Sequence, residues 1–257
     1  MDKIKPNEYI YLYNSENANY FLKYIPNLNF TCHKGNFIFP KDLYWGDTII
    51  TNKGYKFFVL KPGISEFSMK VKRKNTIIYP KEASRILFEL SIYAGKQVVE
   101  IGTGSGAFTY ILSKYVGTEG MVYTYDRNKE FIENAIDNIK KYDPNLSNII
   151  FHNIDPSIND IIEKDVDAVF VDIPEPWTVV HNVYNCLKFG ASAGFLSPNI
   201  EQVQKTVEKM YEVGFRKIKT LELFERQIRV KKDMTRPVDM MIGHTAYLYF
   251  GYKILQK

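Results

Sequence analysis

The sequence contains little cysteine and no long apolar segment. Its 257 residues include 2 cysteines, Cys32 and Cys186, whose wide separation matches neither a redox motif nor a zinc-ligand spacing. We therefore expect reduced thiols, no disulfide framework and no metal. No run of about eighteen uncharged apolar residues occurs, and the opening MDKIKPNEYI lacks the basic and then apolar build of a signal peptide. These absences argue against a membrane protein and make the cytoplasm the expected location.

The net charge is also small, at +5, but the basic residues are unevenly distributed. Between Arg216 and Arg236 there are eight Lys or Arg against three acids, and between Glu66 and Arg85 there are six against two. A solvated surface explains any one such segment. Clusters of this kind are also typical of a surface that binds a polyphosphate partner.

The chain divides into three parts by its sequence pattern. Residues 1–60 read as short strands and turns, with Lys53-Gly54 as a hairpin turn, and predict a small β-rich N-terminal domain. Residues 61–79 are basic and carry Pro62 and Gly63, as a linker does. From residue 80 to residue 257 strand and helix patterns alternate, which predicts a larger α/β domain.

Strands and helices alternate through most of the larger domain. Pro80 suits the first turn of a helix that runs to Gly95. Apolar runs that predict strands follow at 98–101, 121–125, 149–151, 168–173 and 193–196. This alternation indicates a Rossmann-like, mostly parallel sheet covered on both faces. The segments 217–223 and 245–252 are joined by a long basic loop, so we expect them to add an antiparallel pair at one edge and complete seven strands.

A glycine-rich turn links the strand KQVVEIG to the next helix. Gly102, Gly104 and Gly106, with Ser105 between them, leave room for a ligand against backbone N–H groups at a helix N-terminus. The spacing alone also suits a dinucleotide site or a tight turn without a ligand. Glu100 favours S-adenosylmethionine over NAD, because a carboxylate just before the loop attracts a cationic ligand and repels a diphosphate.

Two further acids follow the next two strands. Asp126 closes MVYTYD, at the position where a carboxylate accepts ribose hydroxyls, and Asp155 follows the third strand, where it could accept from an adenine amine. Helix capping is the alternative role for Asp126, and a cap before a helix at Ser157 explains Asp155 equally simply. Because the carboxyl ends of parallel strands meet at one edge of the sheet, we expect these acids to lie close together there.

The fourth strand ends in DIPEPW at residues 172–177. Two prolines hold this loop extended, so Asp172 is expected at the rim of the sheet beside a bound methyl donor, with Trp177 close by. The structural alternative is a rigid turn with a packed tryptophan.

Several motifs together point to one family. They are RKNTIIYPKE at 73–82, EIGTGSG at 100–106, Asp126, Ile154-Asp155, DIPEPW at 172–177, Arg236-Pro237 and IGHT at 242–245. With them the chain resembles, over its whole length, the archaeal and bacterial tRNA (adenine-N1)-methyltransferases that modify position 58 of the T-loop, some of which also act at position 57. Asp126 and Glu175 depart from the usual Glu and Asp but keep the charge.

The resemblance implies a class I S-adenosylmethionine-dependent methyltransferase that acts on tRNA and assembles as a homotetramer. It assigns the cofactor pocket to Glu100, Gly102, Gly104, Ser105, Gly106, Asp126 and Asp155. It assigns the catalytic site to Asp172 and Tyr79. Together with the charge of the long loop, it also predicts tRNA contacts by Trp177, Arg229, Lys231, Arg236 and His244.

The expected reaction needs positioning more than acid–base chemistry. Adenine N1 has a free lone pair, but it lies on the Watson–Crick edge, so the base must be flipped out of its stack. Asp172 would accept a hydrogen bond from N6–H as positive charge develops on the base. The alternatives are an NAD-dependent oxidoreductase on the same sheet, a non-catalytic subunit, and a methyltransferase with another nucleic-acid or protein target.

Overall fold

The computed structural model describes residues 2–14 and 18–255, and the chain divides into two compact units, Met1–Lys70 and Val71–Lys257. The strands of the first unit are β1 (Tyr9–Tyr13), β2 (Tyr20–Lys23), β3 (Asn29–Cys32), β4 (Gly35–Ile38), β5 (Thr48–Ile50) and β6 (Lys56–Leu60). They form an antiparallel sheet in the order β2-β1-β6-β5 and a separate β3-β4 pair. The predicted hairpin turn is confirmed: β5 and β6 pair across Gly54, whose φ of 81° suits glycine. Helix α1 (Ile64–Lys70) ends this unit within the segment expected as a linker.

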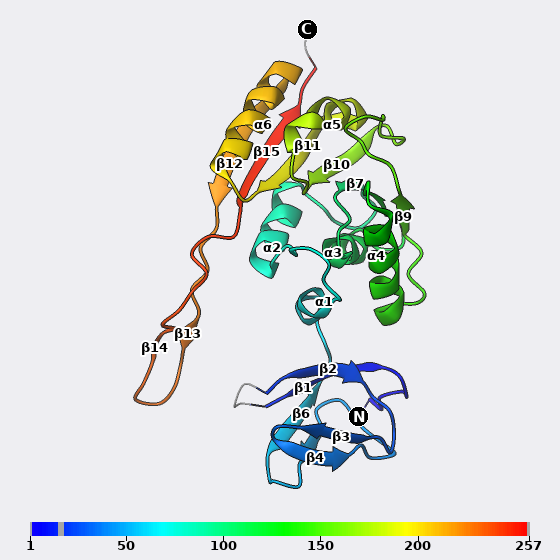
Figure 1. Cartoon of the computed structure of the whole chain (residues 1–257), viewed down its shortest axis with the longest axis vertical. Coiled ribbons are helices and arrows are strands. Elements are labelled where there is room, and N and C mark those ends of the chain that lie inside the picture. Colours follow the sequence, from blue (N-terminus) through cyan, green and yellow to red (C-terminus); the bar gives the residue numbers. More distant parts are fainter. Residues whose placement is uncertain (1, 15–17, 256–257) are drawn as a thin grey trace. The chain divides into compact units, whose positions relative to one another are not determined.

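The second unit is built on a seven-stranded sheet (Figure 1). Its strands are β7 (Gln97–Ile101), β8 (Met121–Tyr125), β9 (Ile149–His152), β10 (Val166–Val171), β11 (Leu187–Ser197), β12 (Phe215–Glu222) and β15 (Tyr247–Lys253). The order across the sheet is β12-β15-β11-β10-β7-β8-β9. Strands β11 to β9 in this order are parallel, and β15 is antiparallel to both β11 and β12. The predicted antiparallel pair at one edge is therefore confirmed.

Helices cover both faces of this sheet. They are α2 (Pro80–Glu89), α3 (Ala107–Val116), α4 (Lys129–Tyr142), the 3-10 turn η1 (Pro176–Thr178), α5 (Val180–Cys186) and α6 (Ile200–Val213). Neighbouring residues on a strand point to opposite faces, so Val99 packs in the core that includes α5 and α6, whereas Val98 packs with α2 and α3. Burial on both faces explains why these strands read as continuous apolar runs.

Several predicted boundaries were wrong. Helix α2 ends at Glu89 rather than at Gly95, because Ser91 takes a left-handed φ of 52°. Gly95 instead closes a turn in which its N–H donates to Val116 O at 2.9 Å. Strand β10 stops before Ile173, and β11 begins at Leu187 rather than at residue 193. The segment at Ser157, where we expected a helix capped by Asp155, is a turn.

The basic connection between β12 and β15 forms a long two-stranded arm, which we define as residues 224–243. Within it β13 (Ile228–Arg229) pairs with β14 (Arg236–Pro237). The arm extends away from the edge of the seven-stranded sheet (orange in Figure 1), and most of its residues are exposed. In the part of the chain that the structure describes, no helix has the length and apolarity needed to cross a membrane.

Candidate active site

A cavity of about 550 Å³ opens at the carboxyl ends of the parallel strands. Six of the residues singled out in the sequence line it: Tyr79, Gly102, Gly104, Asp126, Asp155 and Asp172. They come from the segment before α2 and from the loops after β7, β8, β9 and β10. The prediction that Asp126 and Asp155 lie at the same edge of the sheet is confirmed, as expected for a ligand site in an open α/β sheet.

The glycine loop leaves no space for side chains at two positions. Gly102 has a φ of 103°, and a Cβ there would lie 2.2 Å from the backbone oxygen of Asp172. Gly104 has a φ of 53°, and its Cβ would lie 2.4 Å from the side-chain nitrogen of Asn75. The backbone of the loop is therefore bare on the cavity side, where a ligand can approach it closely.

Asp126 braces this loop and does not cap the following helix. Its Oδ2 accepts from Gly104 N at 3.1 Å and its Oδ1 from Asn128 N at 2.9 Å. The N-cap of α4 is Asn128 itself, whose Oδ1 accepts from Glu130 N at 2.9 Å. The capping alternative for Asp126 is thus wrong, and the side chain is held at the cavity wall by the loop.

Asp155 lines the cavity and also closes a turn. Its Oδ1 accepts from both the N–H and the hydroxyl of Ser157, at 2.9 and 2.7 Å. The hydroxyl of Ser157 contributes most to lowering the pKa of this carboxyl, and the nearby Arg127 adds to the effect. Asp155 is therefore ionised at neutral pH, with Oδ2 3.9 Å from the guanidinium of Arg127.

Glu100, Ser105 and Gly106 are not among the residues that line the cavity. Glu100 is only 1% exposed, and its Oε2 accepts from the hydroxyls of Thr109 and Thr124, both at 2.6 Å. Burial raises its pKa to about 8, so it is mostly neutral at pH 7. Glu100 fastens β7 to β8 and α3 from behind the loop, and its preference for a cationic ligand stays a prediction.

Ser105 and Gly106 also act behind the loop. The hydroxyl of Ser105 donates to Asn75 Oδ1 at 2.7 Å, which ties the segment before α2 to the loop. Gly106 is the N-cap of α3, where a Cβ would lie 2.8 Å from that of Ala135. These two residues shape the pocket without facing it.

Asp172 lines the cavity just beyond the end of β10. Its backbone N–H donates to Ile101 O at 2.8 Å, which fixes the residue at this position. Within residues 2–14 and 18–255 the carboxyl group has no hydrogen-bond or ion-pair partner. Burial raises its pKa to about 7. A half-buried, unpartnered carboxyl group in a cavity is available to a ligand.

Comparison with known proteins decides the family. The family described as tRNA methyltransferase complex GCD14 subunit matches residues 55–242. A tRNA (adenine(57)-N(1)/adenine(58)-N(1))-methyltransferase TrmI from Methanocaldococcus jannaschii is 38% identical over 234 residues, which cover 81% of this chain and 82% of that protein. The chain belongs to the TrmI family of tRNA (adenine-N1)-methyltransferases.

Solved structures give the same result for the fold of this methyltransferase. TrmI from Aquifex aeolicus is 32% identical with a TM-score of 0.86, over 99% of this chain and 100% of that one. A protein from Thermotoga maritima described as an S-adenosylmethionine-dependent O-methyltransferase is 30% identical with a TM-score of 0.91, over 99% and 96%. The fold is the class I methyltransferase fold with a small N-terminal antiparallel β domain.

The remaining predicted residues of the methyltransferase lie outside the cavity wall. Trp177 is on η1, and the centroid of its ring lies 3.8 Å from Lys205 Nζ. Arg229, Lys231 and Arg236 are exposed on the arm, and Arg236 forms an ion pair with Asp239. The structure therefore brings together the predicted cofactor loop and Asp172, but it separates them from the predicted RNA contacts.

His244 is held beside the cavity rather than in its wall. Its Nδ1 lies 2.6 Å from Glu222 Oε1 and its Nε2 lies 2.8 Å from Pro198 O. Glu222 and the carbonyl of Pro198 raise its pKa above 6.5, because both ring nitrogens face acceptors and favour the charged imidazolium.

Sequence reasoning missed several cavity residues, including Asn75, Glu82, Phe131, Gln202 and Thr245. Asn75 and Glu82 fall inside the motif RKNTIIYPKE and Thr245 inside IGHT, so those motifs contained the signal. Phe131 and Gln202 had none, because they occupy ordinary positions of amphipathic helices.

Proposed function

We propose that this chain transfers a methyl group from S-adenosylmethionine to N1 of the adenine at position 58 in the T-loop of tRNA. The observation that carries the proposal is Asp172: a carboxyl group with no partner among the described residues, in a cavity that Gly102, Gly104 and Tyr79 also line. The related protein from M. jannaschii is named for both positions 57 and 58, so position 57 is the second nucleotide to examine.

The residues present fit the methyl donor. The bare backbone at Gly102 and Gly104 would receive it, Asp126 would accept from its ribose hydroxyls, and Asp155 would accept from its adenine amine. Asp126 Oδ2 is already directed at the loop by Gly104 N. When bound, S-adenosylmethionine supplies an electrophilic methyl group on a positively charged sulfur, which would favour ionisation of the neighbouring Asp172.

Asp172 would act on the target base through its ionised form. A carboxylate that accepts a hydrogen bond from N6–H is stabilised more as positive charge spreads from N1 to the amine than in the ground state. Tyr79 would provide an aromatic surface for the base, which has to leave its stack at a cost of roughly a few kcal/mol. The exposed cations of the arm, Arg229, Lys231 and Arg236, would contact phosphates of the tRNA. Assembly as a homotetramer stays a prediction.

The decisive experiment maps the product on RNA. The protein is incubated with S-adenosylmethionine and an unmodified tRNA transcript, which is then digested and analysed by mass spectrometry. We expect 1-methyladenosine at position 58, and its loss when guanine replaces that adenine. A thermal-shift titration should show stabilisation by S-adenosylmethionine and none by NAD.

A second candidate is methyl transfer to oxygen, favoured by the similarity to the T. maritima protein described as an O-methyltransferase. The same digest separates the two reactions, because a 2′-O-methylated nucleotide has the added mass on its ribose. Methylation on ribose alone would refute the N1 proposal.

A further inference from the structure

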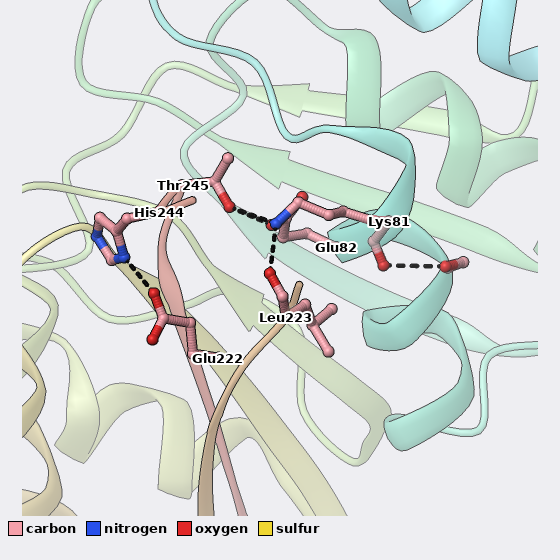
Figure 2. A network of polar contacts seen from close by, with 7 residues as sticks. Lys81, Glu82, Glu222, Leu223, His244 and Thr245 are labelled. Carbon is pink, nitrogen blue, oxygen red and sulfur yellow. Dashed lines mark hydrogen bonds and ion pairs between the residues drawn. The ribbon is translucent and has the colours of Figure 1, made fainter. Parts of the chain in front are cut away.

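Lys81 lies at the junction of three segments (Figure 2). It is in the first turn of α2, two residues after Tyr79. Its ammonium donates to Leu223 O at 2.7 Å and to Thr245 Oγ1 at 2.8 Å, and it lies 2.7 Å from Glu82 Oε1. The hydroxyl of Thr245 in turn donates to the same oxygen of Glu82. One cation therefore binds the residue that precedes the basic arm and a residue that follows it.

A second set of contacts also joins the residue before the arm to a residue after it. Glu222 is the last residue of β12, and His244 lies just beyond residue 243, where the arm ends. The ring of His244 bridges Glu222 Oε1 and Pro198 O. Figure 2 shows the contact between His244 and Glu222 next to the Lys81 contacts. The residues that follow the arm are thus bonded to residues that line the cavity, Thr245 to Glu82 and His244 to Pro198. The residues that precede the arm join the same network through Lys81 and His244.

The Lys81–Glu82 pair is a costly way to achieve stability alone. The two side chains are 13% and 2% exposed, and Glu82 Oε2 is buried with no hydrogen-bond partner among the described residues. Desolvating two charges often cancels their attraction, and apolar residues of similar size stabilise a fold at least as well. Buried polar groups that are only partly satisfied call for a functional explanation.

We infer that Lys81 and Glu82 are positioning residues that fix the basic arm to the wall of the cavity. RNA held by the arm would then present its flipped base in a set register to Tyr79 and Asp172. Thr245 belongs to the same device, because it lines the cavity and its hydroxyl bridges the two charged groups. The inference rests on the proposed function, since it assumes that the arm binds tRNA.

The test compares steady-state kinetics of three variants of the full chain on a tRNA transcript. Thr245→Val removes the bridging hydroxyl at almost constant volume, and Lys81→Met removes the cation. We expect each to lower kcat/KM for tRNA by about tenfold or more, because small misplacements of a substrate have large effects on rate, while affinity for S-adenosylmethionine stays within about twofold. Thr245→Ser should restore most of the rate.

A control variant comes from the opposite end of α2. Lys219 on β12 pairs with Glu89 at the other end of α2, at 2.6 Å and away from the cavity. Lys219→Met should lower the melting temperature less than Lys81→Met, because Lys219 is 49% exposed and Glu89 keeps Arg85 as a partner, and it should leave kcat/KM near that of the wild type. If Lys81→Met and Lys219→Met affect kinetics equally, the pair is only structural.

A double-mutant cycle gives the second readout. If Lys81 transmits the position of the arm, then Lys81→Met and Arg229→Glu should be non-additive in kcat/KM. Additive losses, or a Thr245→Val enzyme as fast as Thr245→Ser, would overturn the inference while wild-type methylation of tRNA still supports the proposed function. A wild-type protein that fails to methylate tRNA refutes that function instead.

Discussion

Replacing Asp172 with asparagine should stabilise the ligand-free protein above pH 7 while removing most of its activity. Burial raises the pKa of this carboxyl from 3.8 to about 7. A group that binds its proton more tightly in the folded chain favours folding fully below its unfolded pKa, and that contribution is lost as the pH rises through the folded value. At pH 8 the wild type therefore keeps an unfavourable buried charge that asparagine does not have.

The size of the effect follows from the shift. A change from 3.8 to about 7 corresponds to about 4 kcal/mol at 1.36 kcal/mol for each pH unit. Because water reaches the cavity, we expect about half of that, roughly 2 kcal/mol at pH 8 and under about 0.5 kcal/mol at pH 4. For a unit of this size the melting temperature should rise by about 5 °C at pH 8.

Differential scanning calorimetry of both proteins from pH 4 to pH 8 checks this expectation. The gap between variant and wild type should widen with pH, and S-adenosylmethionine should narrow it, because the sulfonium favours the wild-type carboxylate. Turnover of the variant should fall by about two orders of magnitude or more, as when one group that stabilises transition-state charge is removed. A variant that is less stable at pH 8, or that turns over normally, would refute the reasoning.

Three further changes test the rest of the site. Gly102→Ala should destabilise the protein by about 3 kcal/mol or more and abolish binding of S-adenosylmethionine, since its Cβ would lie 2.2 Å from Asp172 O; thermal unfolding and titration calorimetry measure both. Glu100→Gln should raise the melting temperature, with a gap to the wild type that grows from about pH 4.5 and levels off above about pH 8, because burial raises the pKa of Glu100 from 4.5 to about 8 and the unfolded chain ionises this group more easily; a variant that is less stable than the wild type at pH 9 would contradict this. Charge reversal at Arg229 and Arg236 together should reduce the slope of log Kd for tRNA against log salt by about 1 to 2, and an unchanged slope would mean that the arm does not contact phosphates.

The fold and the cofactor side of the cavity were predictable because their signals are local. The apolar runs of β7, β8 and β10 predicted buried parallel strands, and the turn after each one placed Gly102, Asp126 and Asp172 at the same edge. Helix ends were less predictable: α2 stops at Glu89 because of a left-handed Ser91, which no periodicity indicates.

The roles of individual charges depended on tertiary structure. Glu100 precedes the glycine loop, but its side chain points away from the cavity into contact with Thr109 and Thr124, and burial neutralises it. His244 belongs to a motif of the family, yet its ring is taken up by Glu222 and Pro198. Neither outcome can be read from residue type.

The amino-acid pattern by itself determined the sheet, its edge pair and the family, because periodicity, turn chemistry and motifs act over a few residues at a time. Folding in three dimensions decided which polar groups meet. Lys81 and Thr245 are separated by 164 positions, and their contact exists because β15 runs antiparallel beside β11 and delivers the end of the arm to the first turn of α2. Long-range packing of this kind leaves no periodic trace in the chain, so only the structure reveals it.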